Sequence, residues 1–320
     1  MKVLEALLTG VMQGAMIALV SLGYTMVYGV LKLINFAHSE VFMMGAYFGI
    51  IALAVLLGQP GLVDGMLLPL RGASTHGPFA AHPVLATGIA TVLAMFAAAA
   101  LGTAVERVAY RPLRKRGRGA LARVTPRVTA LGMSVLLQNL AQLLFSPRVR
   151  PYPQTLSSIP PVGSISSSRV LILVVSITVM VALELIVKRT WFGKAMRALS
   201  ANEEAARLMG IRTSRVISMT FALGSSLAAL GAVLFCLDQS EVYPTMGVII
   251  GTRAFAAAVL GGIGSITGAM LGGVLIGVIG ELVKLTDYSG GADVLVFAVL
   301  IGVLLVRPAG LLGGARVEKV

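Results

Sequence analysis

Long apolar runs separated by short polar stretches make up most of this chain. The hydrocarbon core of a bilayer is about 30 Å thick, and about 20 helical residues are needed to cross it. Runs of that length lie at residues 3–30, 40–58, 84–105, 128–145, 170–187, 216–237 and 292–306, and a glycine-rich run at 251–282 is expected to hold two. The pattern predicts an all-α integral membrane protein, a polytopic helical bundle of eight or nine spans within one transmembrane domain, residues 1–320.

The first two spans are joined without the usual hydrophilic turn. Residues 35–40 read Asn-Phe-Ala-His-Ser-Glu and separate two strongly apolar stretches. Two interpretations stay open: a short interfacial loop, or a broken helix near residues 31–40 whose polar break lies within the membrane. Irregular backbone at membrane depth is tolerated only where protein or a water-filled cavity covers it. In either case Asn35 or Ser39 is expected to cap the helix that follows.

Composition agrees with a membrane protein, and charge predicts its orientation. The chain is 57% hydrophobic and only 12% charged, with a formal net charge of +13. In a soluble protein this charge would suggest nucleic acid, but the Lys and Arg residues fall mostly between spans, so nucleic acid is not an expected partner. Residues 106–127 hold eight Lys or Arg against one Glu, and residues 188–215 hold seven against two.

The positive-inside rule places both basic loops in the cytoplasm. The two assignments agree, because two spans separate the loops. The loops at about 59–83 and 146–169, and the shorter connection at 238–246, should then be external. The side of the N-terminus stays open, because Lys2 and Glu5 cancel.

No pattern of residues predicts bond-making chemistry. The chain has no phosphate-binding loop of the type G-x-x-x-x-G-K-[ST], no H-E-x-x-H and no G-x-S-x-G. Residues 262–267 begin like a dinucleotide fingerprint but have Thr267 in place of the last glycine, so Gly261, Gly262 and Gly264 are assigned to close helix packing. Cys236 is the single cysteine and the three histidines are scattered. We therefore expect no enzyme activity, no cofactor and no metal.

A short polar segment within the basic loop 188–215 can form a helix by itself. Ser200 and Glu203 are spaced as a capping box, Glu203 and Glu204 suit the positive end of a helix dipole, and Gly210 is placed to end the helix. A helix this short is not stable alone in water, so it should pack against something. We interpret Glu203, Glu204, Ala205, Ala206 and Gly210 as a docking surface for a cytosolic protein; an ordinary helical connector is the alternative.

Four polar residues inside predicted spans are candidates for a transport pathway. Unpaired polar groups are costly in lipid and tend to face a cavity, which nominates Asn35, His38, Gln138 and Asn139. Hydrogen bonding between helices is the alternative assignment. Few ionisable residues could lie in the bilayer, which weakens the case for a secondary carrier that works alone. Glu184, Arg253, Glu281 and Asp293 lie near predicted span ends, where snorkelling to the interface is expected, and Glu40 lies beside the Asn35 segment.

Several segments together resemble a known family. Residues 204–210 match EAAxxxG, which resembles the coupling loop of ABC importer permeases. Four further stretches are similar to the LivH-type permease of the branched-chain amino acid ABC importer family and occur in the family's order: residues 23–38, 106–114 with Gln138 and Asn139, 258–265, and 307–311. Ser39 departs from the family pattern, where Gly is expected, and the segment 59–83 is longer than expected.

The resemblance implies a permease subunit for leucine, isoleucine and valine in a bacterial inner membrane. Its partners would be two cytosolic ABC ATPase subunits, a second homologous permease, an extracytoplasmic substrate-binding protein and membrane lipid. Relatives that carry urea or short amides leave those substrates as alternatives.

Overall fold

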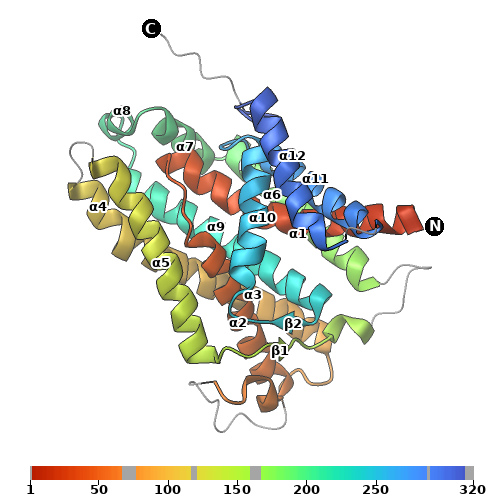
Figure 1. Ribbon diagram of the computed structural model, residues 1–320. Helices are drawn as coiled ribbons and strands as arrows, with labels where there is room; N and C mark the ends of the chain where they lie inside the picture. The colour runs from red at the N-terminus through yellow and green to blue at the C-terminus, as the bar shows by residue number, and fades with distance from the viewer. Residues whose placement is uncertain (1, 67–76, 117–120, 159–166, 287–288, 314–320) are drawn as a thin grey trace. The chain divides into compact units, whose positions relative to one another are not determined.

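Helices make up nearly all of the chain in the computed structural model, which describes residues 2–66, 77–116, 121–158, 167–286 and 289–313. The helices are α1 (Lys2–Leu31), α2 (His38–Leu57), α3 (Pro83–Val105), α4 (Arg111–Arg116), α5 (Leu121–Phe145), α6 (Ser167–Arg189), α7 (Trp191–Ala201), α8 (Glu203–Leu208), α9 (Thr213–Gln239), α10 (Met246–Gly261), α11 (Ile266–Lys284) and α12 (Ala292–Val306) (Figure 1). Two-residue strands β1 (Arg150–Pro151) and β2 (Glu241–Val242) form an antiparallel pair. Short turns are η1 (Pro60–Val63), η2 (Glu106–Tyr110), η3 (Thr155–Ser158) and η4 (Ser289–Gly291).

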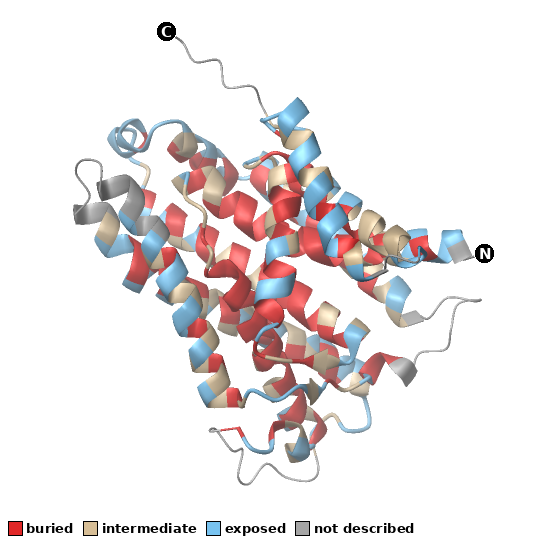
Figure 2. Cartoon of the chain, in the orientation of Figure 1, coloured by how far each residue is buried: buried red, intermediate tan, exposed pale blue. Residues whose placement is uncertain are grey.

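The apolar helices leave much of their surface exposed. Within the described residues, seven helices are long and apolar enough to span a bilayer, and α10 and α12 are shorter apolar helices. Only 22% of the most apolar window of α5 is buried, against 72% for α2 and 78% for α9. Figure 2 shows the buried residues concentrated along α2 and α9 and the exposed ones along α5. Exposed side chains such as Phe96, Val135 and Leu143 need an apolar solvent, so the predicted all-α polytopic membrane protein is confirmed.

The helices cluster into two compact units. One unit contains residues 1–32, 173–220 and 252–320, and the other contains residues 33–172 and 221–251. In the first unit, α1 and α11 interlock through glycines. A methyl group on Gly14 would lie 2.6 Å from the Cα of Val274, and one on Gly273 would lie 2.6 Å from the Cα of Ala18. Such backbone contact is possible only where a residue has no side chain, as in small-residue packing in membranes.

The predicted packing glycines lie in the turn between α10 and α11, so the assignment is only partly right. A methyl group on Gly261 would collide with the carbonyl oxygen of Gly268, 1.9 Å away, which is a true close approach. Gly262 is a close approach too, because a methyl group there would lie 2.4 Å from the backbone nitrogen of Gly313. Gly262 and Gly264 also have positive φ angles, of +105° and +98°. Nothing lies within 4 Å of a methyl group built on Gly264, so this residue serves backbone conformation and not packing.

In the second unit, α2 is held by α5 and α9. Gly45 lets α2 approach the backbone of Ala229 on α9, where an added methyl group would lie 2.6 Å from Cα. On α5, the ring of Phe145 stacks on Tyr47 of α2 with centroids 4.3 Å apart. These contacts fix α2 along its length.

The three connections predicted to be external meet at one end of the second unit. Arg150 pairs with Val242 in the small ladder, and the backbone N–H of Tyr152 donates to the carbonyl oxygen of Ser240 at 2.8 Å. Arg150 also reaches the carbonyl oxygen of Leu62 in η1, at 3.5 Å. Residues 67–76 and 159–166 of these loops lie outside the described residues.

Candidate functional site

The basic loop 188–215 contains an amphipathic helix, α7, that was not predicted. Its buried residues Phe192, Ala195, Met196 and Leu199 recur at helical spacing. At its start, the Thr190 hydroxyl accepts from the backbone N–H of Gly193, and Gly193 lies so close to α6 that a methyl group there would collide with the carbonyl oxygen of Val187. Arg197 donates to that same oxygen at 2.6 Å. The helix is therefore packed firmly against the end of α6.

The short helix α8 follows after one residue, and its cap differs from the prediction. The Asn202 side-chain oxygen accepts from the backbone N–H of Ala205 at 3.0 Å, so Asn202 is the N-cap. The predicted capping box is wrong, because packing of α7 extends that helix through Ser200, whose hydroxyl accepts from Lys32 at 2.7 Å.

Gly210 ends α8 as predicted, in a left-handed turn with φ of +82°. The N–H groups of Gly210 and Ile211 donate to the carbonyl oxygens of Arg207 and Ala206, both at 3.0 Å, which is the Schellman pattern. Two free carbonyl groups at the helix end are thereby satisfied.

The surface of α8 combines acidic and apolar side chains. Leu208 and Met209 are 89% and 83% exposed, and Glu203, Glu204 and Ala205 are exposed beside them. Ala206, which was expected on this surface, is instead buried. We call Glu203, Glu204, Ala205, Leu208 and Met209 the α8 surface. In water these two large apolar side chains are the kind that a partner covers.

The polar break between α1 and α2 brings together two of the four predicted pathway residues. Helical geometry stops at Leu31 and resumes at His38, and Lys32 has a φ of +56°. Asn35 and His38 are both buried, and the backbone N–H of His38 donates to the Asn35 carbonyl oxygen at 3.1 Å.

Neither Asn35 nor Ser39 caps α2, so the predicted cap is wrong. The N-cap residue is Ala37, with no side-chain hydrogen bond. The Asn35 amide oxygen accepts from the Tyr110 hydroxyl at 2.7 Å, and the Ser39 hydroxyl donates to the Phe36 carbonyl oxygen at 2.8 Å. Both side chains are engaged elsewhere by tertiary and local contacts.

Tyr110 belongs to a π-helical turn, η2, that the sequence analysis did not identify as functional. Glu106 and Tyr110 are buried within it, and the Tyr110 ring packs against Phe221 with centroids 5.4 Å apart. π-helical turns are rare and frequently occur at functional sites. The segment was noted only as part of a family resemblance.

The other two predicted pathway residues lie on α5. Asn139 is exposed, and its amide donates to the Val135 carbonyl oxygen of its own helix at 2.8 Å. Gln138 is half-buried, one helical turn beyond Ser134, which contacts α2. Gln138 therefore shares the inward face of α5, and Asn139 does not.

Glu40, at the start of α2, was noted as an ionisable residue beside the polar break but was not among the four predicted pathway residues. Its carboxylate is fully buried, with one oxygen 3.4 Å from the hydroxyls of Ser39 and Ser134. The other oxygen has no hydrogen-bond partner. A charged residue at the edge of an apolar run was the available signal.

The charges near the predicted span ends form ion pairs. Arg253 lies in the middle of α10, because this helix begins five residues earlier than predicted, and its Nε is 2.6 Å from Asp293 of α12. Glu281 pairs with Lys284, and Glu184 lies 2.5 Å from Lys188.

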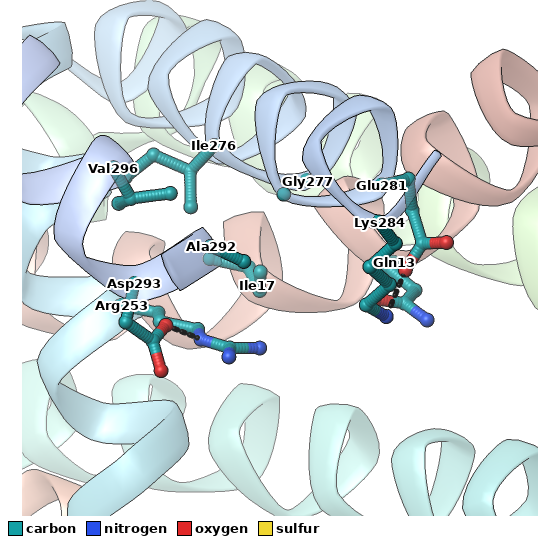
Figure 3. Close-up of a pocket in the computed structure, with 11 residues that line it drawn as sticks. Gln13, Ile17, Arg253, Ile276, Gly277, Glu281, Lys284, Ala292, Asp293 and Val296 are labelled. Carbon is teal, nitrogen blue, oxygen red and sulfur yellow. Dashed lines mark hydrogen bonds and ion pairs between the residues drawn. The ribbon is translucent and has the colours of Figure 1, made fainter. Parts of the chain in front are cut away.

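Two of these pairs border a cavity of the first unit, lined also by Gln13 and Gly277 (Figure 3). The cavity volume of ≈ 10 Å³ is about that of one water molecule, too small for an amino acid. The second unit has an open depression of ≈ 380 Å³ among Leu57, Gln59, Pro83, Pro153 and Gln154, where the three joined connections meet.

Comparison with known proteins gives one consistent result. The family described as "branched-chain amino acid transport system / permease component" matches residues 6–306. The chain is similar to the high-affinity branched-chain amino acid transport system permease protein BraD of Pseudomonas aeruginosa, at 40% identity over 99% of this chain and 98% of BraD. It is 38% identical to the LivH permease proteins of Escherichia coli K12 and Salmonella typhimurium, over 99% of this chain and 97% of each. No solved structure matches it.

Proposed function

Because this chain belongs to the family of branched-chain amino acid transport system permease components, we propose that it is the membrane-spanning subunit of an ATP-driven importer of leucine, isoleucine and valine. The observation that carries the proposal is the 40% identity to BraD across nearly the whole of both chains. The chain is a transport subunit and not an enzyme, so ATP is hydrolysed by partner subunits. We place it in the bacterial inner membrane with two ATPases, a second permease and an external binding protein.

The orientation follows from contacts within the first unit. The positive-inside rule puts the loop with α7 and α8 in the cytoplasm. The hydroxyl of Thr267, at the start of α11, donates to Glu184 near the end of α6, so α11 begins on the cytoplasmic side. Helix α1 runs antiparallel to α11, since Gly10 faces Val278 and Gly14 faces Val274. The N-terminus, whose side the sequence left open, is therefore external.

The α8 surface is the contact for the ATPase in this proposal. Its two exposed apolar side chains enter a groove of the ATPase, and Glu203 and Glu204 suit basic groups at the rim of that groove. Because α7 is anchored on α6 and its Ser200 accepts from Lys32 just beyond α1, movement of α8 is passed to two membrane helices.

The external face of the second unit is the docking surface for the binding protein. The depression is open and is lined by two of the external connections; β1 and β2 tie one of these to residues 241–242, and Arg150 ties it to Leu62. This arrangement gives a rigid rim, which suits a protein that docks and releases in each transport cycle.

The decisive experiment is reconstitution of the full complex in proteoliposomes. With ATP inside and leucine-loaded binding protein outside, we expect uptake of labelled leucine that unlabelled isoleucine and valine reduce and urea does not. Omission of the ATPases should abolish uptake. Competition by urea or short amides, or gradient-driven uptake without ATPases, would instead favour one of the two alternatives and contradict the proposal.

A further inference from the structure

Among the residues that the structure describes, no cation pairs with the fully buried carboxylate of Glu40. By contrast, the less buried carboxylates of Glu184, Glu281 and Asp293 each have a Lys or Arg within ion-pair distance. In the part of the chain that the structure describes, Glu40 has only the hydroxyls of Ser39 and Ser134 near one oxygen and nothing near the other. A buried acceptor without a donor disfavours the folded state, so its retention calls for a use.

The carboxylate of Glu40 does not cap its own helix and instead contacts the neighbouring helices as well as Ser39. Glu40 is the third residue of α2, a position from which a glutamate side chain commonly folds back onto the N-cap N–H. Here it does not; one oxygen points toward Ser134 of α5, and the other lies beside Gly247 of α10, where an added methyl group would be 3.0 Å away. The carboxylate therefore stands between helices, at the edge of the polar break.

A helix N-terminus and two glycines of α10 border the carboxylate of Glu40. The N-terminus of α2 presents the positive end of its dipole to Glu40. Residues facing the first turn of α2 from α10 are Gly247 and Gly251, whose missing side chains leave the backbone close to Ser39. Movement of α10 away from α2 by a small distance would open the free oxygen of Glu40 without displacing any side chain of α10.

We propose that Glu40 binds the ammonium group of the transported α-amino acid when the two helices separate. The inference rests on the proposed function and adds a specificity: a substrate must carry a positively charged nitrogen. An ammonium group supplies the hydrogen bonds and the charge that the buried carboxylate lacks. Urea, short amides and the 2-oxo acids that correspond to branched-chain amino acids have no such group, so this contact discriminates against them.

The test uses the complete reconstituted complex with L-leucine as the probe. Glu40→Gln keeps the size of the side chain and removes its charge. We expect leucine uptake per ATP hydrolysed to fall by more than about tenfold, as for loss of one partner of a buried charge pair, while assembly and ATPase stimulation by loaded binding protein persist. The matched control is Glu281→Gln, which neutralises a carboxylate that has its own lysine and should leave uptake unchanged.

A second variant separates charge from structure. In Glu40→Gln combined with Ser134→Asp, a carboxylate returns from α5 to nearly the same place, since the Ser134 hydroxyl is 3.4 Å from Glu40. Recovery of leucine uptake in the double variant supports the proposal. This holds even if the Glu40→Gln variant alone assembles poorly. Normal leucine uptake per ATP by Glu40→Gln, or an assembled double variant with active ATPase and no uptake, overturns it. A wild-type complex that takes up no α-amino acid overturns the proposed function and this inference with it.

Discussion

Replacement of Gly210 by alanine adds one carbon atom and tests whether an ordered end of α8 is needed for coupling. Gly210 ends α8 with a φ of +82°, and nothing lies within 4 Å of a methyl group built there. The Gly210→Ala change therefore introduces no collision and removes no contact. Its whole effect is the cost of holding a residue with a side chain in the left-handed region.

The expected magnitude follows from that conformation. A left-handed residue other than glycine costs about 1–2 kcal/mol, which lowers the ratio of the closed to the open helix end by about 5- to 30-fold. A six-residue helix has little stability of its own to absorb this loss. The α8 surface should accordingly be disordered for a larger fraction of the time.

Two assays read this out independently. Tryptic cleavage after Arg207, within α8, should accelerate by the same about 5- to 30-fold, because proteolysis of a transiently open segment follows its population. In proteoliposomes, ATPase stimulation and leucine uptake should fall together. Gly210→Asn should behave nearly as wild type, since asparagine tolerates the left-handed region. Gly132→Ala, a helical glycine in open space, is the control for the added methyl group.

The outcome of these assays separates two errors. Unchanged cleavage in Gly210→Ala would refute the strain argument itself. Accelerated cleavage with full ATPase stimulation and uptake would leave the strain argument intact and remove α8 from the coupling mechanism.

Three further predictions concern other parts of the chain. Gly14→Val should lower the free energy of unfolding of the purified protein by more than about 1–3 kcal/mol, seen as a lower melting temperature, because the new side chain meets the backbone of α11. Gly29→Val, in open space, should leave the melting temperature unchanged. Tyr110→Phe should cost about 1–3 kcal/mol in the same measurement, since a buried amide oxygen loses its donor; an unchanged melting temperature would contradict this. In a cysteine-free background, Glu5→Cys should react with a membrane-impermeant maleimide in intact cells and Leu208→Cys only after permeabilisation; the reverse pattern would refute the proposed orientation.

Much of the fold could be predicted from the sequence because the bilayer imposes a simple rule on helix length and polarity. The apolar runs, the break before His38 and the end of α8 at Gly210 are all local signals. The side of α1 could not be predicted, because its flanking charges cancel; the external side proposed above depends on its antiparallel contact with α11.

The details of the candidate sites depended on contacts between distant segments. Ser200 and Asn202 are both good N-cap residues, and the choice between them was made by packing of α7 on α6. Asn35 does not cap α2, because its side-chain oxygen accepts from the hydroxyl of Tyr110, which is 75 residues away in sequence. Glu40 could be seen as unusual in the sequence, but only the fold shows that, among the described residues, no cation pairs with it.

The interlocked glycines of α1 and α11 also bear on how this gene can vary. Every amino acid other than glycine adds at least one carbon atom, and at Gly14, Gly273 and Gly277 that atom would meet backbone of the partner helix at less than 3 Å. All nineteen replacements at each of these positions are thus harmful for the same reason, whatever their polarity. In a library of variants selected only for abundance in the membrane, substitutions at these codons would be depleted as strongly as in a library selected for growth on leucine.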